Sequence, residues 1–249
     1  MLEVKNLSAC RGKKQVLRNI NLELLSGTLT VIIGKNGSGK SSLCECINAT
    51  VSYSGKILFS GEDAALLPPR KRARYISYLP QTLRCPHITV EELVSLGRTP
   101  YVGVSGRLTE EDRKKCLQAS KELGLEAVYN KFVDEISGGE RQKAYLAMML
   151  AQDSDVLMLD EPTSHMDIGV ERAFADTLRI LAKKGKAVLA VMHNINLAAD
   201  IADRIIVMSG GKIVFGGKRE ECLRCEIIEK EFGVRRFDAA GKSFFAAGK

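Results

Sequence analysis

The residues with the clearest potential for chemistry form the segment Gly34–Ser41, which reads Gly-x-x-x-x-Gly-Lys-Ser, the pattern of a phosphate-binding loop. Its three glycines allow backbone conformations that a Cβ atom forbids, so consecutive N–H groups can turn toward an anion. Lys40 could reach the β- and γ-phosphates of a nucleotide, and the Ser41 hydroxyl could ligate Mg²⁺. A plain glycine-rich turn is the alternative. The apolar strand expected over Leu29–Ile33 and the helix expected from Lys40 favour the phosphate-binding interpretation, because they supply the context of that motif and a positive helix end.

This loop predicts that the chain binds a nucleoside triphosphate. The residues expected to contact the nucleotide here are Gly34, Lys35, Asn36, Gly37, Ser38, Gly39, Lys40, Ser41 and Ser42.

Two carboxylates follow a second apolar run, Val156–Leu159. At the end of a buried strand Asp160 could hold Mg²⁺ through water, while Glu161 could polarise the attacking water. The same pair could be an ordinary strand terminus. The phosphate-binding loop upstream favours the catalytic interpretation.

A second anion site is indicated by Ser137, Gly138 and Gly139, which precede a helix expected to run to about residue 150. The serine hydroxyl and the glycine N–H groups would lie at the positive end of that helix. A helix cap followed by a flexible Gly-Gly pair is the alternative.

Composition limits the classes of protein to consider. The 249 residues are 45% hydrophobic and 27% charged, and no apolar run approaches the length of a membrane span. No signal peptide is recognisable and the seven cysteines are scattered, so we expect a cytoplasmic protein with reduced thiols. Cys44/Cys46 and Cys222/Cys225 are interpreted as ordinary thiols rather than metal or redox pairs.

The formal charge of +7 favours acidic partners. The densest basic run, Arg70–Arg74, is interpreted as a solvated surface helix, because no aromatic residues are interleaved for stacking on bases. No nucleic-acid partner is expected.

The pattern of elements predicts an α/β fold. Short apolar and polar segments over residues 2–33, with a further strand over 52–61, suggest a small antiparallel sheet. Helices are expected after Thr89, from Thr109 to Gly124 and after Ser137, as an insertion that we place at about 82–150.

The core resumes after the insertion. Strands are expected at Val156–Leu159 and Ala187–Met192 with a helix over about 169–184 between them, which implies a parallel sheet. A hairpin over 204–215 and one last helix over about 219–231 follow, and the tail to residue 249 is uninformative. We expect one domain over residues 1–249, with a C-terminal helix and tail at about 219–249.

Taken together, Gly34–Ser41, Ile136–Gln142 and Asp160–Glu161 resemble the motifs of ATP-binding cassette (ABC) ATPases, over about residues 2–234. The resemblance implies a P-loop NTPase core with a mainly parallel sheet, an N-terminal antiparallel β-subdomain and an inserted α-helical subdomain. It also implies Mg²⁺ and ATP as ligands, and a head-to-tail dimer. Each ATP would lie between one P-loop and the partner's signature motif, residues Ser137, Gly138, Gly139 and Glu140.

The same resemblance assigns further roles. Gln81 resembles the Q-loop glutamine that senses Mg²⁺ and the attacking water, and Ser164–Asp167 resembles the D-loop. His193 resembles the switch histidine at the γ-phosphate. The residues implied to act in catalysis are Glu161, His193, Gln81 and Lys40, with Ser41, Gln81 and Asp160 at the metal and Asp167 near the nucleotide.

Several positions depart from the pattern of the family. Leu is commoner than Ile136 and Met166, Asp is usual in place of Asn194, and Pro is frequent in place of Lys35. Arg11 lies where an aromatic residue usually stacks on adenine. Because a guanidinium plane can also stack on a base, Arg11 is expected to contact the nucleotide.

Within the family, segments such as Tyr78–Gln81, Leu96–Tyr101 and His193–Ala198 are most similar to the branch serving iron–siderophore, haem and cobalamin import. This implies an ATP-hydrolysing subunit, peripheral on the inner face of the cell membrane, that powers a separate permease and indirectly serves a substrate-binding protein. The alternative is a soluble ABC ATPase acting in cofactor assembly or on nucleic acid or ribosomes.

Overall fold

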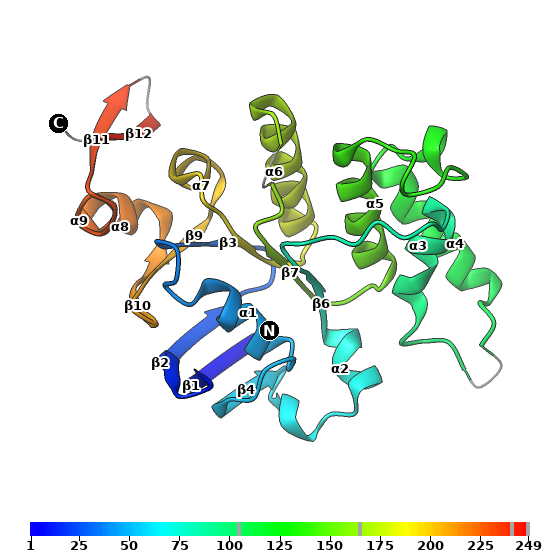
Figure 1. The fold of residues 1–249 in the computed structure, drawn as a ribbon, viewed down its shortest axis with the longest axis horizontal. Helices are drawn as coiled ribbons and strands as arrows, with labels where there is room; N and C mark the ends of the chain where they lie inside the picture. Colours follow the sequence, from blue (N-terminus) through cyan, green and yellow to red (C-terminus); the bar gives the residue numbers. More distant parts are fainter. Residues whose placement is uncertain (104–105, 164–165, 240–241, 248–249) are drawn as a thin grey trace.

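A six-stranded sheet in the order β10-β9-β3-β8-β7-β6 forms the centre of the protein (Figure 1). We describe it from a computed structural model over residues 1–103, 106–163, 166–239 and 242–247. The pairs β3–β8, β3–β9, β7–β8 and β6–β7 are parallel, and only β10 runs antiparallel to its neighbour β9 among the strands described in this sheet. The strands are β3 (Leu29–Ile33), β6 (Ile76–Leu79), β7 (Val156–Asp160), β8 (Ala187–Val191), β9 (Arg204–Ser209) and β10 (Lys212–Lys218). The predicted mainly parallel core is confirmed.

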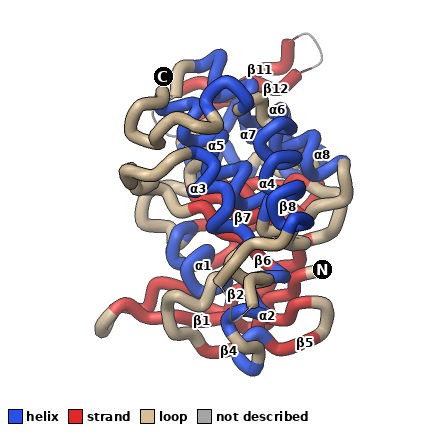
Figure 2. Tube along the Cα trace, turned by 90° about the vertical axis from the view of Figure 1, so that its right-hand side faces the viewer, coloured by secondary structure: helices blue, strands red, loops and turns tan. Residues whose placement is uncertain are grey.

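The N-terminal segments form a separate antiparallel sheet in the order β2-β1-β4-β5, as the sequence predicts. Its strands are β1 (Leu2–Arg11), β2 (Lys14–Leu24), β4 (Ser54–Phe59) and β5 (Glu62–Asp63). Helix α1 (Lys40–Ile47) packs between this sheet and the large one, and Figure 2 shows it above β1 and β2. Helix α2 (Pro69–Tyr75) has no buried residue, so the basic run is a solvated surface helix, as predicted.

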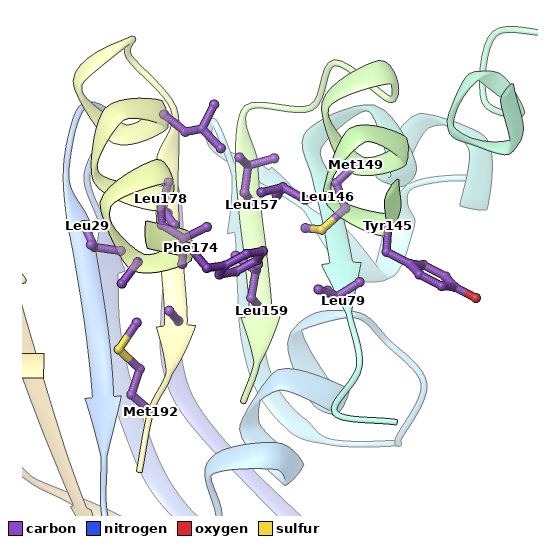
Figure 3. Packing of buried hydrophobic residues seen from close by; sticks show 14 of the residues in the cluster. Leu29, Leu79, Tyr145, Leu146, Met149, Leu157, Leu159, Phe174, Leu178 and Met192 are labelled. Atoms are coloured by element: carbon purple, nitrogen blue, oxygen red, sulfur yellow. The ribbon is translucent and has the colours of Figure 1, made fainter. Parts of the chain in front are cut away.

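The central strands β3, β7 and β8 are buried on both faces, and their alternate residues enter two hydrophobic clusters. In β7, Leu157 and Leu159 face the cluster that contains Phe174 of α6 and Leu146 of α5, which Figure 3 shows in close packing. Met158 faces the other cluster, with α1 and the N-terminal sheet. The central part of the sheet is therefore packed between two layers.

Three helices form the insertion between β6 and β7: α3 (Val90–Ser95), α4 (Glu110–Glu122) and α5 (Gly138–Ala151), grouped at the right of Figure 1. Each begins with a capping box, at Thr89, Thr109 and Ser137. Arg98, in the turn after α3, joins two of them: its Nε donates to buried Asp112 Oδ1 of α4 at 2.8 Å, and its Nη1 donates to Ala151 O of α5 at 2.7 Å. Burial alone would raise the pKa of Asp112, but hydrogen bonds from Thr109 and Arg98 lower it.

The C-terminal part differs from the expectation. After α6 (Ile168–Lys183) and α7 (Ile195–Ile201), the single helix expected over about 219–231 is two short helices, α8 (Arg219–Arg224) and α9 (Ile227–Phe232). The prediction of one helix is wrong because Glu226 adopts a left-handed backbone, φ 54°, which ends one helix before the next. The tail forms a hairpin of β11 (Val234–Ala239) and β12 (Lys242–Ala247). The described residues also form three short 3₁₀ turns, at Ala64–Leu66, Leu96–Arg98 and Glu126–Val128.

Candidate nucleotide-binding site

The loop after β3 has the backbone that phosphate binding requires. Gly39 precedes α1 with φ 104°, a conformation that L side chains rarely adopt. At Gly34, a Cβ atom would meet Met208 O at 2.5 Å and Ser38 Oγ at 2.6 Å. The glycines therefore keep the cradle open, and α1 begins at Lys40 as the sequence predicts.

Lys40 is held against the loop that it serves. Its Nζ donates to the carbonyl oxygens of Gly34 at 2.8 Å and Lys35 at 3.3 Å, and the residue is only 5% exposed. Burial lowers the pKa of Lys40, an effect that the nearby carboxylates of Glu161 and Asp160 oppose. A buried cation satisfied mainly by carbonyl oxygens favours an arriving anion.

A cavity of about 620 Å³ brings together segments that are far apart in the sequence. Among the predicted site residues, the cavity is lined by Arg11, Asn36, Gly37, Gly39, Lys40, Ser41, Ser42, Gln81, Glu161 and His193. Gly34, Lys35 and Ser38 belong to the loop without being part of this lining. Sequence reasoning missed the opposite rim, formed by Lys14, Gln15, Val16, Arg18, Gly210 and Gly211. The missed residues carry no motif of their own, and they meet because Arg18 N donates to Gly211 O at 2.8 Å.

Asp160, at the end of β7, is 2% exposed and has one oxygen without a partner among the described residues, Oδ1. Its Oδ2 accepts a long hydrogen bond of 3.5 Å from Tyr78. Burial raises the pKa of Asp160, while a hydrogen bond from Ser41 lowers it. A buried, unsatisfied carboxylate oxygen beside a serine hydroxyl is a donor set that fits a hard divalent cation such as Mg²⁺.

Each carboxylate oxygen of Glu161 has a side-chain partner. Its Oε1 lies 2.5 Å from His193 Nε2, and its Oε2 accepts a hydrogen bond from Gln81 Nε2. The Glu161 side chain is 8% exposed, whereas that of His193 is 47% exposed. Glu161 also has a left-handed backbone, φ 51°, and its N–H donates to Val191 O at 3.2 Å. Such a conformation is costly for a residue other than glycine and is characteristic of functional sites.

The second predicted anion site lies in a separate cavity of about 800 Å³, lined by Ser137, Gly138, Gly139, Met166 and Asp167 and also by Gln81. Ser137 caps α5, because its Oγ accepts from Glu140 N at 3.3 Å. Glu140 is not part of the lining. Its carboxylate accepts from Ser137, and these hydrogen bonds lower the pKa of Glu140. Ser164 and His165, in the predicted D-loop, lie outside the described residues.

The two helix starts predicted to bind phosphate thus face different cavities, and Gln81 lines both. One nucleotide bound at α1 would leave the start of α5 available for another anion.

Comparisons with known proteins agree with this geometry. Residues 17–164 match the ABC transporter family profile. The chain is 36% identical over 256 residues to the hemin import ATP-binding protein HmuV of Plesiomonas shigelloides, covering 95% of each chain. It is 35% identical over 237 residues to the ferric enterobactin transport ATP-binding protein FepC of Escherichia coli (strain K12), covering 94% of this chain and 88% of that protein.

Among solved structures, a dimeric bacterial ABC transporter cassette, MJ0796, superposes with a TM-score of 0.76 at 27% identity, covering 88% of this chain and 99% of the other. With the family profile, both relatives and the shared fold in agreement, this chain belongs to the ABC transporter ATP-binding proteins and is an ATPase of that family.

Proposed function

We propose that this chain is the ATP-hydrolysing subunit of an importer for an iron–siderophore complex, haem or cobalamin. The observation that carries the proposal is that the starts of α1 and α5, both predicted to bind phosphate, line separate cavities. Two copies arranged head to tail would place each nucleotide between the P-loop of one chain and Ser137–Gly139 of the other. The names of the similar proteins, which refer to hemin import and ferric enterobactin transport, support the choice of cargo.

We further propose that residues 1–249 act as a single nucleotide-binding domain, peripheral on the inner face of the cell membrane, on which a separate permease docks. Among the described helices, none combines the length and the apolar character needed to cross a membrane. The permease would contact the groove between Gln81 and the helical insertion at 82–150. A substrate-binding protein would contribute only through the permease.

In this proposal the chemistry is in-line attack of water on the γ-phosphate of ATP. Glu161 accepts the proton of that water, and Gln81 and His193 hold its carboxylate in place. Lys40 and the loop N–H groups offset the charge that develops on the phosphate oxygens. Ser41, Asp160 and Gln81 would hold Mg²⁺, which when bound supplies further positive charge at the β- and γ-phosphates.

The transport role is tested by an affinity pull-down of the tagged chain from detergent-solubilised native membranes, with mass spectrometry of the proteins that co-purify. We expect a multi-span permease in nearly equal amount, since the chain has no described membrane span of its own. An untagged strain is the control. Co-purification with ribosomal or assembly proteins, and no permease, would overturn the transport role and keep the ATPase chemistry.

Glu161→Gln removes the proposed base but retains the size of the side chain and one hydrogen-bond acceptor. We expect the hydrolysis rate to fall by about 10²–10⁴-fold. ATP should still bind, so the variant should accumulate as an ATP-bound dimer in size-exclusion chromatography. Glu122→Gln, which neutralises a carboxylate paired with Lys184 on another surface, is the control. An unchanged rate in Glu161→Gln would reject the base assignment.

Asp160→Asn separates metal binding from stability. Because burial raises the pKa of Asp160, the folded state holds a proton there more tightly than the unfolded state does, and stability falls as the pH rises above the ordinary aspartate pKa. We expect Asn to raise the melting temperature of the nucleotide-free protein at neutral pH, by about 2–4 °C for each kcal/mol gained. The gain should vanish in acid.

The added stabilisation by Mg²⁺ with ATP should be largely lost in the same Asp160→Asn variant. Thermal unfolding with and without Mg²⁺ and ATP measures both effects. A lower melting temperature without nucleotide, or full stabilisation by Mg²⁺ with ATP, would contradict this view of Asp160.

Arg11→Ala tests the contact to the base. Arg11 lines the cavity of about 620 Å³ that includes the phosphate-binding loop, which we call the P-loop cavity. An ion pair with Glu45 of α1 holds the edge of its guanidinium, which leaves the planar face available for stacking. Loss of that stacking should weaken ATP binding by about 0.5–2 kcal/mol, measured by calorimetry. Lys13→Ala removes a charge from the same turn at a position outside the cavity lining and is the matched control. If both variants bind ATP as the native chain does, Arg11 does not contact the base.

A further inference from the structure

Glu171, in the first turn of α6, connects the loop that carries Glu161 to the loop that carries His193. Its Oε1 accepts a hydrogen bond from Thr163 Oγ1 at 3.1 Å, and its Oε2 accepts one from Asn194 Nδ2 at 3.0 Å. Thr163 follows Glu161 by two residues, and Asn194 follows His193 directly. The carboxylate of Glu171 therefore contacts both loops. The side chains of Glu161 and His193, which lie 2.5 Å apart, line the cavity of about 620 Å³.

Two other attachments of the loop after Glu161 are seen among the described residues on either side of positions 164–165. Gln142 of α5 donates to the carbonyl oxygen of Pro162, and Met166 N donates to Thr163 O at 3.2 Å. Glu161 itself has a left-handed backbone, so its loop must be held by its surroundings. Of the contacts described there, only that from Glu171 also reaches the loop of His193.

The contact with Asn194 depends on the amide. Asn194 caps α7, because its Oδ1 accepts from Leu197 N at 3.0 Å, which leaves Nδ2 to donate to Glu171. An aspartate at this position would cap the helix equally well but would present a carboxylate to a carboxylate. The amide is therefore what lets the cap and the connection to Glu171 coexist.

We infer that Glu171 is a positioning residue for ATP hydrolysis, which fixes Glu161 and His193 relative to each other through Thr163 and Asn194. The inference rests on the roles proposed above for Glu161 and His193. Glu171 is not part of the P-loop cavity lining, so it acts on turnover rather than on binding of the nucleotide.

Glu171 and Asn194 both line a cavity of about 750 Å³, and the other charged residues in its lining are Arg172, Arg179, Asp200, Arg219, Glu220 and Lys242. Arg172 pairs with Asp176 and Asp200, Lys242 also pairs with Asp200, and Arg219 pairs with Glu220. These pairs balance most of the charge around Glu171, so the test below compares each variant with the native chain at every pH.

The test is Asn194→Asp, which keeps the helix cap, removes the donor to Glu171 and places a second carboxylate against it. We expect kcat for ATP to fall about tenfold, or about 1.4 kcal/mol, with little change in KM. The loss relative to the native chain should shrink as the pH is lowered toward the ordinary carboxyl range, because one of two facing carboxyl groups then takes a proton and can donate.

The decisive variant is the double exchange of Asn194→Asp with Glu171→Gln, which restores one amide and one carboxylate across the same contact. We expect kcat to return to within about threefold of the native value, with a native pH profile. Glu220→Gln, in the same cavity but without contact to either loop, is the matched control and should leave kcat unchanged.

A native kcat in Asn194→Asp at every pH, or a loss that Glu171→Gln does not relieve, would overturn the inference. If Asn194→Asp does not fold, Thr163→Val removes the other contact, and an unchanged kcat in that variant would equally overturn it. Glu161→Gln measured alongside separates the cases: if it abolishes hydrolysis while the Glu171 contacts prove silent, the proposed base stands and only the positioning role falls.

Discussion

The site depends on one constraint, the common edge at which neighbouring parallel strands end. β3 leads into the phosphate-binding loop, β6 ends just before Gln81, β7 ends in Asp160, and β8 ends just before His193. Since β3, β8, β7 and β6 are adjacent and parallel, their carboxyl ends meet at one edge. Residues more than 150 positions apart in the chain, such as Lys40 and His193, therefore line one cavity without any long loop having to fold over the site.

This edge concentrates charge that is unfavourable without a ligand. Lys40 and Asp160 are both buried. Burial lowers the pKa of Lys40 and raises the pKa of Asp160, and both shifts favour the neutral form. The rigid layers on either face of the sheet keep these groups in place, because alternate residues of each strand enter one of two packed clusters. A nucleotide with its metal ion would supply the missing counter-charges, so the packing of the core maintains a site that binding then stabilises.

The sequence was sufficient for the parts of the fold and site that are local. A short run of residues determines a turn, a strand end or a helix cap. The sequence therefore predicts the glycine-rich loop after β3, the carboxylates after β7 and the capped start of α5. The part of the cavity lining at Arg18 and Gly211 could not be predicted, because it arises from contact between two hairpins that are far apart in the sequence. The split of the last helix at Glu226 was missed because no residue pattern there indicates a left-handed backbone at a glutamate. The connection from Glu171 to Thr163 and Asn194 was equally invisible, as it joins three elements through side chains alone.

Side chains of this kind also attach the candidate site to parts of the molecule that lie outside it. Gln142 holds the loop of Glu161 from α5, so a displacement of the helical insertion would act directly on that loop. On the other side, Asn196 of α7 exchanges two hydrogen bonds with the backbone of Phe245, and Asp200 pairs with Lys242, which fasten β12 to the helix that begins next to His193. Glu171 lies between these two attachments and contacts both loops. Because the contacts are hydrogen bonds with defined geometry, a shift at either end must be shared by Glu161 and His193 together or must break the connection at Glu171.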